Sequence, residues 1–246
     1  MTIFNKGNDM LDAEVVRVKV SGDFACFTRA DLKVERMTYP CMTPSAARGI
    51  LDSILWKPEF QWYVRRILVL KPIQFISVKR NEIKARQGKN PIIIEDVRTQ
   101  RHSLILKDVA YIIEASIYQK VFDKKNQPQK YKTIFRRHVQ KGQCFRRPFL
   151  GTREFAAEFY EPDQNEVPIQ ESVPIGSMLF DLIYDTTGKP RPIYFYDVAL
   201  INGVLECPAK ENEMLMQSSH IRPPVDREFS SFMYAFNQIE EREMGQ

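Results

Sequence analysis

Lys130, Tyr131 and His138 are the residues whose types and spacing best suit chemistry on an RNA phosphodiester. Cleavage of RNA without a metal ion needs a group that takes the proton from the 2′-hydroxyl, a cation beside the phosphate and a proton donor for the departing 5′-oxygen. On a helix, Tyr131 and His138 would lie on one face about 10 Å apart. They could flank an RNA strand, but they could not share one phosphate oxygen. The alternative is that both residues pack, Tyr131 as a core aromatic and His138 beneath a sheet.

Other catalytic signatures are absent from the sequence. The three histidines are far apart, and none has a cysteine or carboxylate partner at metal-ligand spacing. The four cysteines occur singly, which is typical neither of a zinc site nor of a disulfide scaffold. There is no G-x-S-x-G elbow, P-loop, G-x-G-x-x-G fingerprint or D-x-D cluster. We therefore expect no metal site and no cofactor.

Positive charge is concentrated in residues 120–153, which hold 11 of the 36 Lys and Arg residues and one of the 31 acids. A cationic block attracts polyanions, because neutralised phosphates give most of the sequence-independent affinity for nucleic acid. Interleaved aromatic and glycine residues favour a binding groove over the alternative, a solvated lysine-rich surface. The RNA-binding residues predicted in this segment are Lys132, Arg136, Arg137, Lys141, Arg146, Arg147 and Arg153.

Two helices are predicted to position these groups. Thr43 and Pro44 form an N-cap and first-turn pair, followed by an apolar stripe that ends before Pro58. The second helix begins at Pro128 and ends before Gly142, where a left-handed cap is expected. Lys130 would then stand at the positive end of a helix dipole, which is unfavourable and so favours a role facing phosphate.

Strand patterns complete an α+β fold. Strands are predicted at 15–20, in 61–78 with a break at Pro72, at 103–122 and at 153–160, with a mobile loop over 79–101. The order strand, helix, strand, strand, helix, strand is typical of a ferredoxin-like (RNA-recognition-motif-like) domain, here 15–160. Three more strands and an apolar helical tail predict a small antiparallel β-rich domain with a terminal helix at 175–246.

Composition is that of a globular protein, with 43% hydrophobic and 27% charged residues among 246. No stretch approaches the ~18 uncharged apolar residues of a membrane-spanning helix, and the first residues lack a signal-peptide pattern, so we expect a cytoplasmic protein with no membrane partner. A cytosolic enzyme acting on a small phosphorylated metabolite is a remote alternative.

Several segments together resemble the Cas-five proteins of type I-C CRISPR systems, in the RAMP superfamily. The resemblance covers roughly residues 15–208. Its segments are 21–29 (SGDFACFTR), 33–40 (KVERMTYP), 43–51 (TPSAARGIL), 56–58 (WKP), 71–74 (KPIQ), 80–82 (RNE), 98–101 (RTQR), 106–109 (LKDV), 136–137 (RR), 141–143 (KGQ) and 150–155 (LGTREF).

The resemblance implies metal-independent cutting of precursor CRISPR RNA within the repeat, by attack of the 2′-hydroxyl to give a cyclic phosphate. It implies as partners the repeat stem-loop, the retained 5′ handle, and the backbone and large subunits of the type I-C surveillance complex, with duplex DNA as a further candidate. Arg48, within the third segment, joins the predicted RNA-binding residues.

The family pattern places a tyrosine at the end of the first helix and a Lys-His pair at the start of the second. Matched residue by residue, the lysine is Lys130, but the other positions hold Leu55 and Tyr131. Leu55 cannot transfer protons, and a tyrosine with a pKa near 10 is a poor base unless neighbouring cations lower that value. Tyr39, before the first helix, is the predicted stand-in for the missing tyrosine. The alternative function is a non-catalytic subunit that binds the 5′ handle.

Overall fold

The structure is a computed structural model that describes residues 15–29, 32, 35–86, 88–119, 127–184, 190–207 and 217–218. Its main sheet is almost entirely antiparallel and has the strand order β6-β1-β5-β3-β9, with β2 and β4 also paired to β5. Among the strands of the described residues, β2 alone pairs in the parallel sense. The strands of this sheet are β1 (Val16–Ala25), β2 (Arg36–Met37), β3 (Phe60–Val69), β4 (Phe75–Ile83), β5 (Arg98–Gln119), β6 (Glu158–Tyr160) and β9 (Val204–Glu206).

A second antiparallel sheet has the order β10-β8-β7. It consists of β7 (Val173–Tyr184), β8 (Pro190–Leu200) and β10 (Gln217–Ser218). Met178, Phe180 and Phe195 of this sheet belong to the same buried cluster as the residues of the main sheet. The proposed boundaries at 15–160 and 175–246 stay a prediction, and the predicted helical tail lies outside the described residues.

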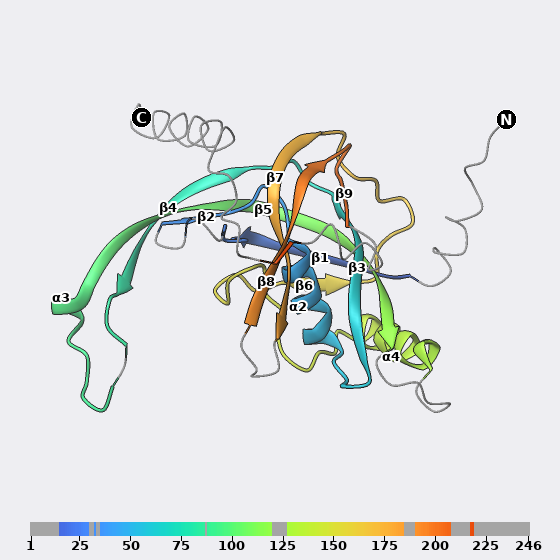
Figure 1. The fold of residues 1–246 in the computed structure, drawn as a ribbon, viewed down its shortest axis with the longest axis horizontal. Helices are drawn as coiled ribbons and strands as arrows, with labels where there is room; N and C mark the ends of the chain where they lie inside the picture. The colour runs from blue at the N-terminus through green and yellow to red at the C-terminus, as the bar shows by residue number, and fades with distance from the viewer. Residues whose placement is uncertain are drawn as a thin grey trace.

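The strand β5 is 22 residues long and serves two parts of the molecule. Its second half pairs with β1 and β3, whereas its first half pairs with β4 in a hairpin that extends away from the body and carries α3 (Ile94–Val97) at its far end (Figure 1). The predicted loop over 79–101 is therefore wrong for 79–83 and 98–101. Glu82 forms a cross-strand ion pair with Arg101 of β5 and a second pair with Arg80 on its own strand. These pairs stabilise a strand ladder in a segment whose polar, charged composition predicts a loop.

Both predicted long helices are confirmed. α2 (Pro44–Ile54) begins after Thr43, whose Oγ1 accepts a hydrogen bond from the Ala46 amide at 3.2 Å. α4 (Pro128–Gln140) ends in a turn in which Gly142 has a φ of 62° and the Gln143 amide donates to the His138 carbonyl at 2.8 Å. The strand after α4 is shorter than predicted, 158–160 rather than 153–160, because a turn closed by Phe155 N–H and Thr152 O precedes it.

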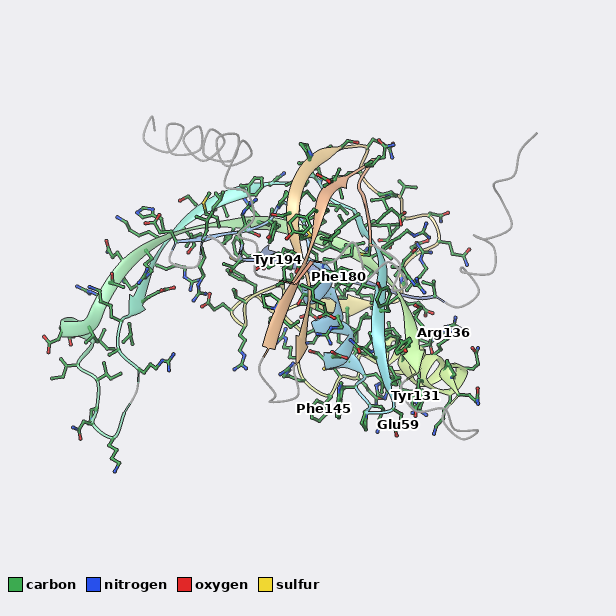
Figure 2. The ribbon with its side chains drawn as sticks, in the orientation of Figure 1. Glu59, Tyr131, Arg136, Phe145, Phe180 and Tyr194 are labelled. Atoms are coloured by element: carbon green, nitrogen blue, oxygen red, sulfur yellow. The ribbon has the colours of Figure 1, made fainter. Side chains whose placement is uncertain are left out.

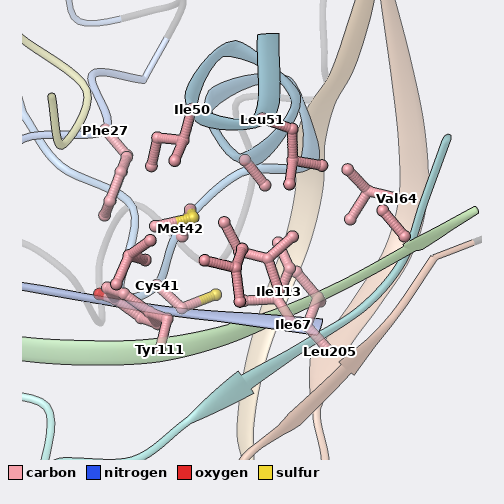
Figure 3. Packing of buried hydrophobic residues seen from close by; sticks show 14 of the residues in the cluster. Phe27, Cys41, Met42, Ile50, Leu51, Val64, Ile67, Tyr111, Ile113 and Leu205 are labelled. Atoms are coloured by element: carbon pink, nitrogen blue, oxygen red, sulfur yellow. The ribbon is translucent and has the colours of Figure 1, made fainter. Parts of the chain in front are cut away.

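The core lies between these helices and the sheets. Figure 3 shows Ile50 and Leu51 of α2 above Ile67 and Ile113 of the central strands. Under α4, the Trp62 ring packs against Phe135 at a centroid distance of 4.8 Å. Burial of this apolar stripe holds each helix on the sheet and so fixes the side chains at the helix ends.

Candidate nucleic-acid interface

The C-terminal end of α2 is the point at which α4, the loop after it and β3 meet. A helix end leaves its last carbonyls without partners inside the helix. Here three of them accept bonds from other segments. Ser53 O accepts from the Phe145 and Arg146 amides at 2.9 and 3.1 Å, Ile54 O lies 3.1 Å from His138 Nδ1, and Leu55 O accepts from Trp62 Nε1 at 2.8 Å. The basic segment is therefore fixed to α2 at several points.

The contact with Ile54 O orients the His138 ring. A carbonyl oxygen only accepts, so Nδ1 carries the hydrogen and Nε2 of the neutral ring holds the lone pair. His138 is half-buried, and α4 presents it toward α2. Nε2 is the ring nitrogen that Ile54 O does not engage.

Lys130 and Tyr131 lie at the other end of α4. The Lys130 side chain is exposed, and its Nζ is 5.5 Å from the centroid of the Tyr131 ring, within cation–π range. The Tyr131 ring is only 2% exposed and packs on Phe60 at a centroid distance of 4.7 Å. Figure 2 shows Tyr131 near Glu59, at the start of β3. Tyr131 is therefore a core residue, and its catalytic role stays a prediction.

The two ends of α4 are too far apart to form a single phosphate site. Lys130 and His138 are eight residues apart, which corresponds to about 12 Å along a helix. Tyr131 and His138 are separated by about 10 Å on the same basis. One phosphate therefore cannot contact both ends, and an RNA strand would have to lie along the helix to reach both.

The predicted cations divide into surface residues and residues held inside. Arg48 contacts Asp181 of β7 at 2.6 Å and Asp52 at 3.9 Å. Lys132 is 5% exposed. The exposed members are Arg136, Arg137, Lys141, Arg146, Arg147 and Arg153. Of these, Arg147 pairs with Glu158 at 2.7 Å on the surface, where such pairs are weak.

Tyr39 lies in the core and not beside Lys130 on α4. It is 2% exposed, its amide donates to Phe27 O at 2.9 Å, and the Arg29 guanidinium lies 5.1 Å from its ring centroid. It precedes the N-terminal end of α2, whereas α4 is fixed to the C-terminal end. Its catalytic role stays a prediction.

Two exposed aromatic residues add to the surface around the end of α2. Phe145 is 87% exposed although its amide is bonded to Ser53, and Trp56, directly after the end of the helix, is 59% exposed. Trp56 is not among the predicted RNA-binding residues, although the segment 56–58 (WKP) carries part of the family resemblance. Its signal was its position beyond the apolar stripe, where no core contact is required. Exposed aromatics beside cations suit the stacking of unpaired bases.

Buried thiols do not add a nucleophile. Burial raises the pKa of Cys41 to about 12 and raises that of Cys207 as well, so both are thiols at neutral pH. Across the described residues, no group of three or more His, Cys, Asp and Glu side chains is arranged to hold a metal ion. In the same part of the chain, none of the helices has the length and apolar character needed to cross a membrane.

The comparisons with known proteins agree with the resemblance found in the sequence. The family described as CRISPR-associated protein (Cas_Cas5), in its Cas5d form, matches residues 15–179. A protein of Thermus thermophilus named CRISPR pre-crRNA endoribonuclease Cas5d is 43% identical over 218 residues, which cover 81% of this chain and 94% of that protein. A protein of Mannheimia succiniciproducens with the same name is 39% identical over 218 residues, which cover 80% of this chain and 96% of that protein. The chain belongs to the Cas5 family of CRISPR-associated proteins.

Solved structures show the same fold. A crystal structure of a CRISPR-associated protein matches with a TM-score of 0.60 at 24% identity, covering 80% of this chain and 93% of that one. A functionally uncharacterized protein from Streptococcus mutans matches with a TM-score of 0.59 at 20% identity, with the same coverage. At these identities the likeness concerns the fold alone.

Proposed function

We propose that this protein is an endoribonuclease that cleaves precursor CRISPR RNA within the repeat and stays bound to the 5′ handle as a subunit of the type I-C interference complex. The observation that carries this proposal is the identity of 43% and 39% with two proteins named as pre-crRNA endoribonucleases, over 94% and 96% of their lengths. The exposed cations and aromatics around α4 and the end of α2 support an RNA-binding surface there.

The fold proposed for residues 15–160 is ferredoxin-like. In its favour, β1, α2, β3, β5, α4 and β6 follow one another in the order of that fold, with the β4 hairpin as an insertion before β5. The neighbouring strands β6, β1, β5 and β3 are antiparallel. The remaining residues, 175–246, are proposed as the small β-rich domain, represented by β7, β8 and β10.

The proposed chemistry needs no metal ion. The 2′-oxygen loses its proton and attacks the adjacent phosphorus, the bond from phosphorus to the 5′-oxygen breaks, and that oxygen takes up a proton. The products are a 2′,3′-cyclic phosphate and a 5′-hydroxyl. Lys130 stabilises the charge on the phosphate, and Tyr131, which occupies the position of the histidine in the family's Lys-His pair, takes part in the proton transfer. His138, with Nε2 available, is the alternative proton-transfer group.

The proposed partners follow from the same surface. The exposed cations would hold the repeat stem-loop and 5′ handle, and the family membership suggests the backbone and large subunits of the complex as protein partners. Duplex DNA is a further proposed ligand of the cationic surface.

A second candidate function is a non-catalytic subunit that binds the 5′ handle. Two observations favour it: Leu55, where the family pattern has a tyrosine, is 4% exposed, and Tyr131 is 2% exposed. A protein of this kind would retain the cationic surface and lack the proton-transfer groups.

The test is incubation of the purified protein with its cognate repeat RNA in EDTA. The proposed function predicts one cut in the repeat, a cyclic phosphate on the upstream product and a retained downstream product. Tight binding with intact RNA would favour the second candidate. Cutting that appears only when Mg²⁺ is added would contradict the metal-independent mechanism.

A further inference from the structure

A cavity of about 300 Å³ opens beside the N-terminal half of α2, at the opposite end of that helix from His138. Part of its wall is apolar, from Phe27, Phe149 and Leu179. Thr28 and Ser45 contribute hydroxyl groups to the wall, and Arg146 contributes a cation. A volume of this size is at the lower end of small-ligand pockets, so it suits one nucleotide and not a folded partner.

Gly49 is exposed and lines the cavity without adding a side chain to it. Gly49 lies inside α2, where glycine is less favourable than alanine. A Cβ built at this position meets no atom within 4 Å. A longer side chain at residue 49 therefore has room to extend into the cavity that Gly49 lines.

The other walls of the cavity are fixed by backbone contacts. Gly151 has a φ of 84°, and a Cβ there would be 2.0 Å from Cys26 O, so this turn lies directly on the end of β1. The Cys26 amide also donates to Leu150 O at 3.0 Å. Arg146 is held through its amide, 3.1 Å from Ser53 O. The cavity is therefore preformed, and a ligand does not have to order it.

We propose that this cavity binds a single unstacked nucleotide of the RNA, which deepens the proposed function and rests on it. The base lies against the apolar wall, its edge meets the hydroxyl groups, and the adjoining phosphate contacts Arg146. Two first-turn amides of α2 are already engaged, because Ala46 N–H is bonded to Thr43 Oγ1 and Ala47 N–H to Thr43 O, so the phosphate is assigned to Arg146. Since α2 spans about 16 Å, this nucleotide lies a few positions along the RNA from the phosphates at α4.

The test combines a filled cavity with RNAs that lack one base. Gly49→Leu fills the cavity, Gly49→Ala adds one methyl group, and Gly88→Leu is the matched control at a second glycine with open space around it. Affinities are measured for the wild type and each variant with a series of repeat RNAs, each abasic at one position. The RNA has a non-cleavable 2′-deoxy at the cut site.

We expect one abasic position to weaken binding to the wild type by about tenfold, the contribution of one stacked base. Gly49→Leu should weaken binding of intact RNA by a similar factor and should be insensitive to that same position. Gly88→Leu should behave as the wild type. The inference is wrong if Gly49→Leu binds every RNA with wild-type affinity. It is also wrong if the affinity lost through Gly49→Leu adds to the affinity lost at every abasic position, with no position to which the variant is insensitive.

Two further measurements keep the result interpretable. Thermal melting checks the fold of Gly49→Leu, and Ser45→Leu fills the same cavity from another position if that variant does not fold. Adenosine and uridine 5′-monophosphate, tested as free ligands, overturn the inference if either binds in a Gly49-dependent manner while RNA binding is unaffected by Gly49→Leu. Wild-type cutting with no effect of either filling variant contradicts the nucleotide pocket alone, whereas a wild type that neither binds nor cuts repeat RNA contradicts the proposed function.

Discussion

The two ends of α4 carry similar residue types in very different settings. At the N-terminal end, Lys130 is exposed above the buried Tyr131 ring, and the first turn has no acidic residue. At the C-terminal end, His138 is bonded to Ile54 O, and the exposed Arg137 and Lys141 stand where the helix dipole favours cations. At the N-terminal end, the positive helix dipole and Lys130 together favour a bound phosphate. At the C-terminal end, the negative end of the dipole already stabilises the cations.

This difference predicts separate roles for the two ends of α4. We expect the N-terminal end to stabilise the charge of the reacting phosphate and the C-terminal end to hold the strand. His138 is already bonded to the last turn of α2, so we expect it to help position the RNA. Lys130 lies at the positive end of the α4 dipole, so a bound anion stabilises it most.

Lys130→Ala should have the largest effect. We expect cutting of repeat RNA to fall by about 10²–10³-fold, as for loss of one transition-state charge contact, while binding falls much less. Lys130→Arg should retain part of the activity, and Lys107→Ala, at an exposed lysine of β5, is the control. Single-turnover cleavage rates measure the effect. Unchanged cutting by the double variant Lys130→Ala and Tyr131→Ala would show that the site is misplaced.

Tyr131→Phe and His138→Gln compare the proton-transfer groups of the two ends. Tyr131→Phe keeps the ring on Phe60 but removes the hydroxyl, and we expect a loss of about 100-fold in cutting. His138→Gln can still donate to Ile54 O, so we expect less than about a tenfold loss. Single-turnover rates across a pH series separate the two, and the reverse order of effects would move proton transfer to the C-terminal end.

Replacing Arg136, Arg137 and Lys141 with alanine should have the smallest effect on the chemical step. Each lost phosphate contact lowers the slope of log affinity against log salt by about 0.7 for a single strand. We expect weaker binding with a cutting rate at saturation within about twofold of the wild type. The control replaces the exposed Lys84, Arg86 and Lys89 of the hairpin. If the α4 variant keeps the wild-type slope of log affinity against log salt, the RNA does not contact these three residues.

Local signals allowed the helices to be predicted from the sequence. Thr43 and Pro44 start α2, and Pro128 and Gly142 frame α4, because caps depend on neighbours in the chain. Partners distant in sequence could not be predicted. Arg48 of α2 contacts Asp181 of β7, more than a hundred residues away, and no local pattern indicates this pair. Its RNA-binding role stays a prediction.

The candidate site was predictable in composition but not in arrangement. The basic segment and its exposed arginines followed from charge alone, whereas burial of Lys132 and Tyr131 depends on how α4 rests on β3. The carbonyl that fixes His138 lies 84 residues earlier in the chain, and no local pattern announces it. The cavity beside Gly49 likewise forms from segments that are far apart in sequence.

The separate roles of the two ends of α4 can be tested most directly by a crystal structure with repeat RNA that carries a 2′-deoxy sugar at the cut site. The account predicts Lys130 Nζ within about 4 Å of an oxygen of the uncut phosphate, with the strand continuing toward Arg137 and Lys141. A phosphate at His138, with Lys130 more than about 10 Å away, would contradict it.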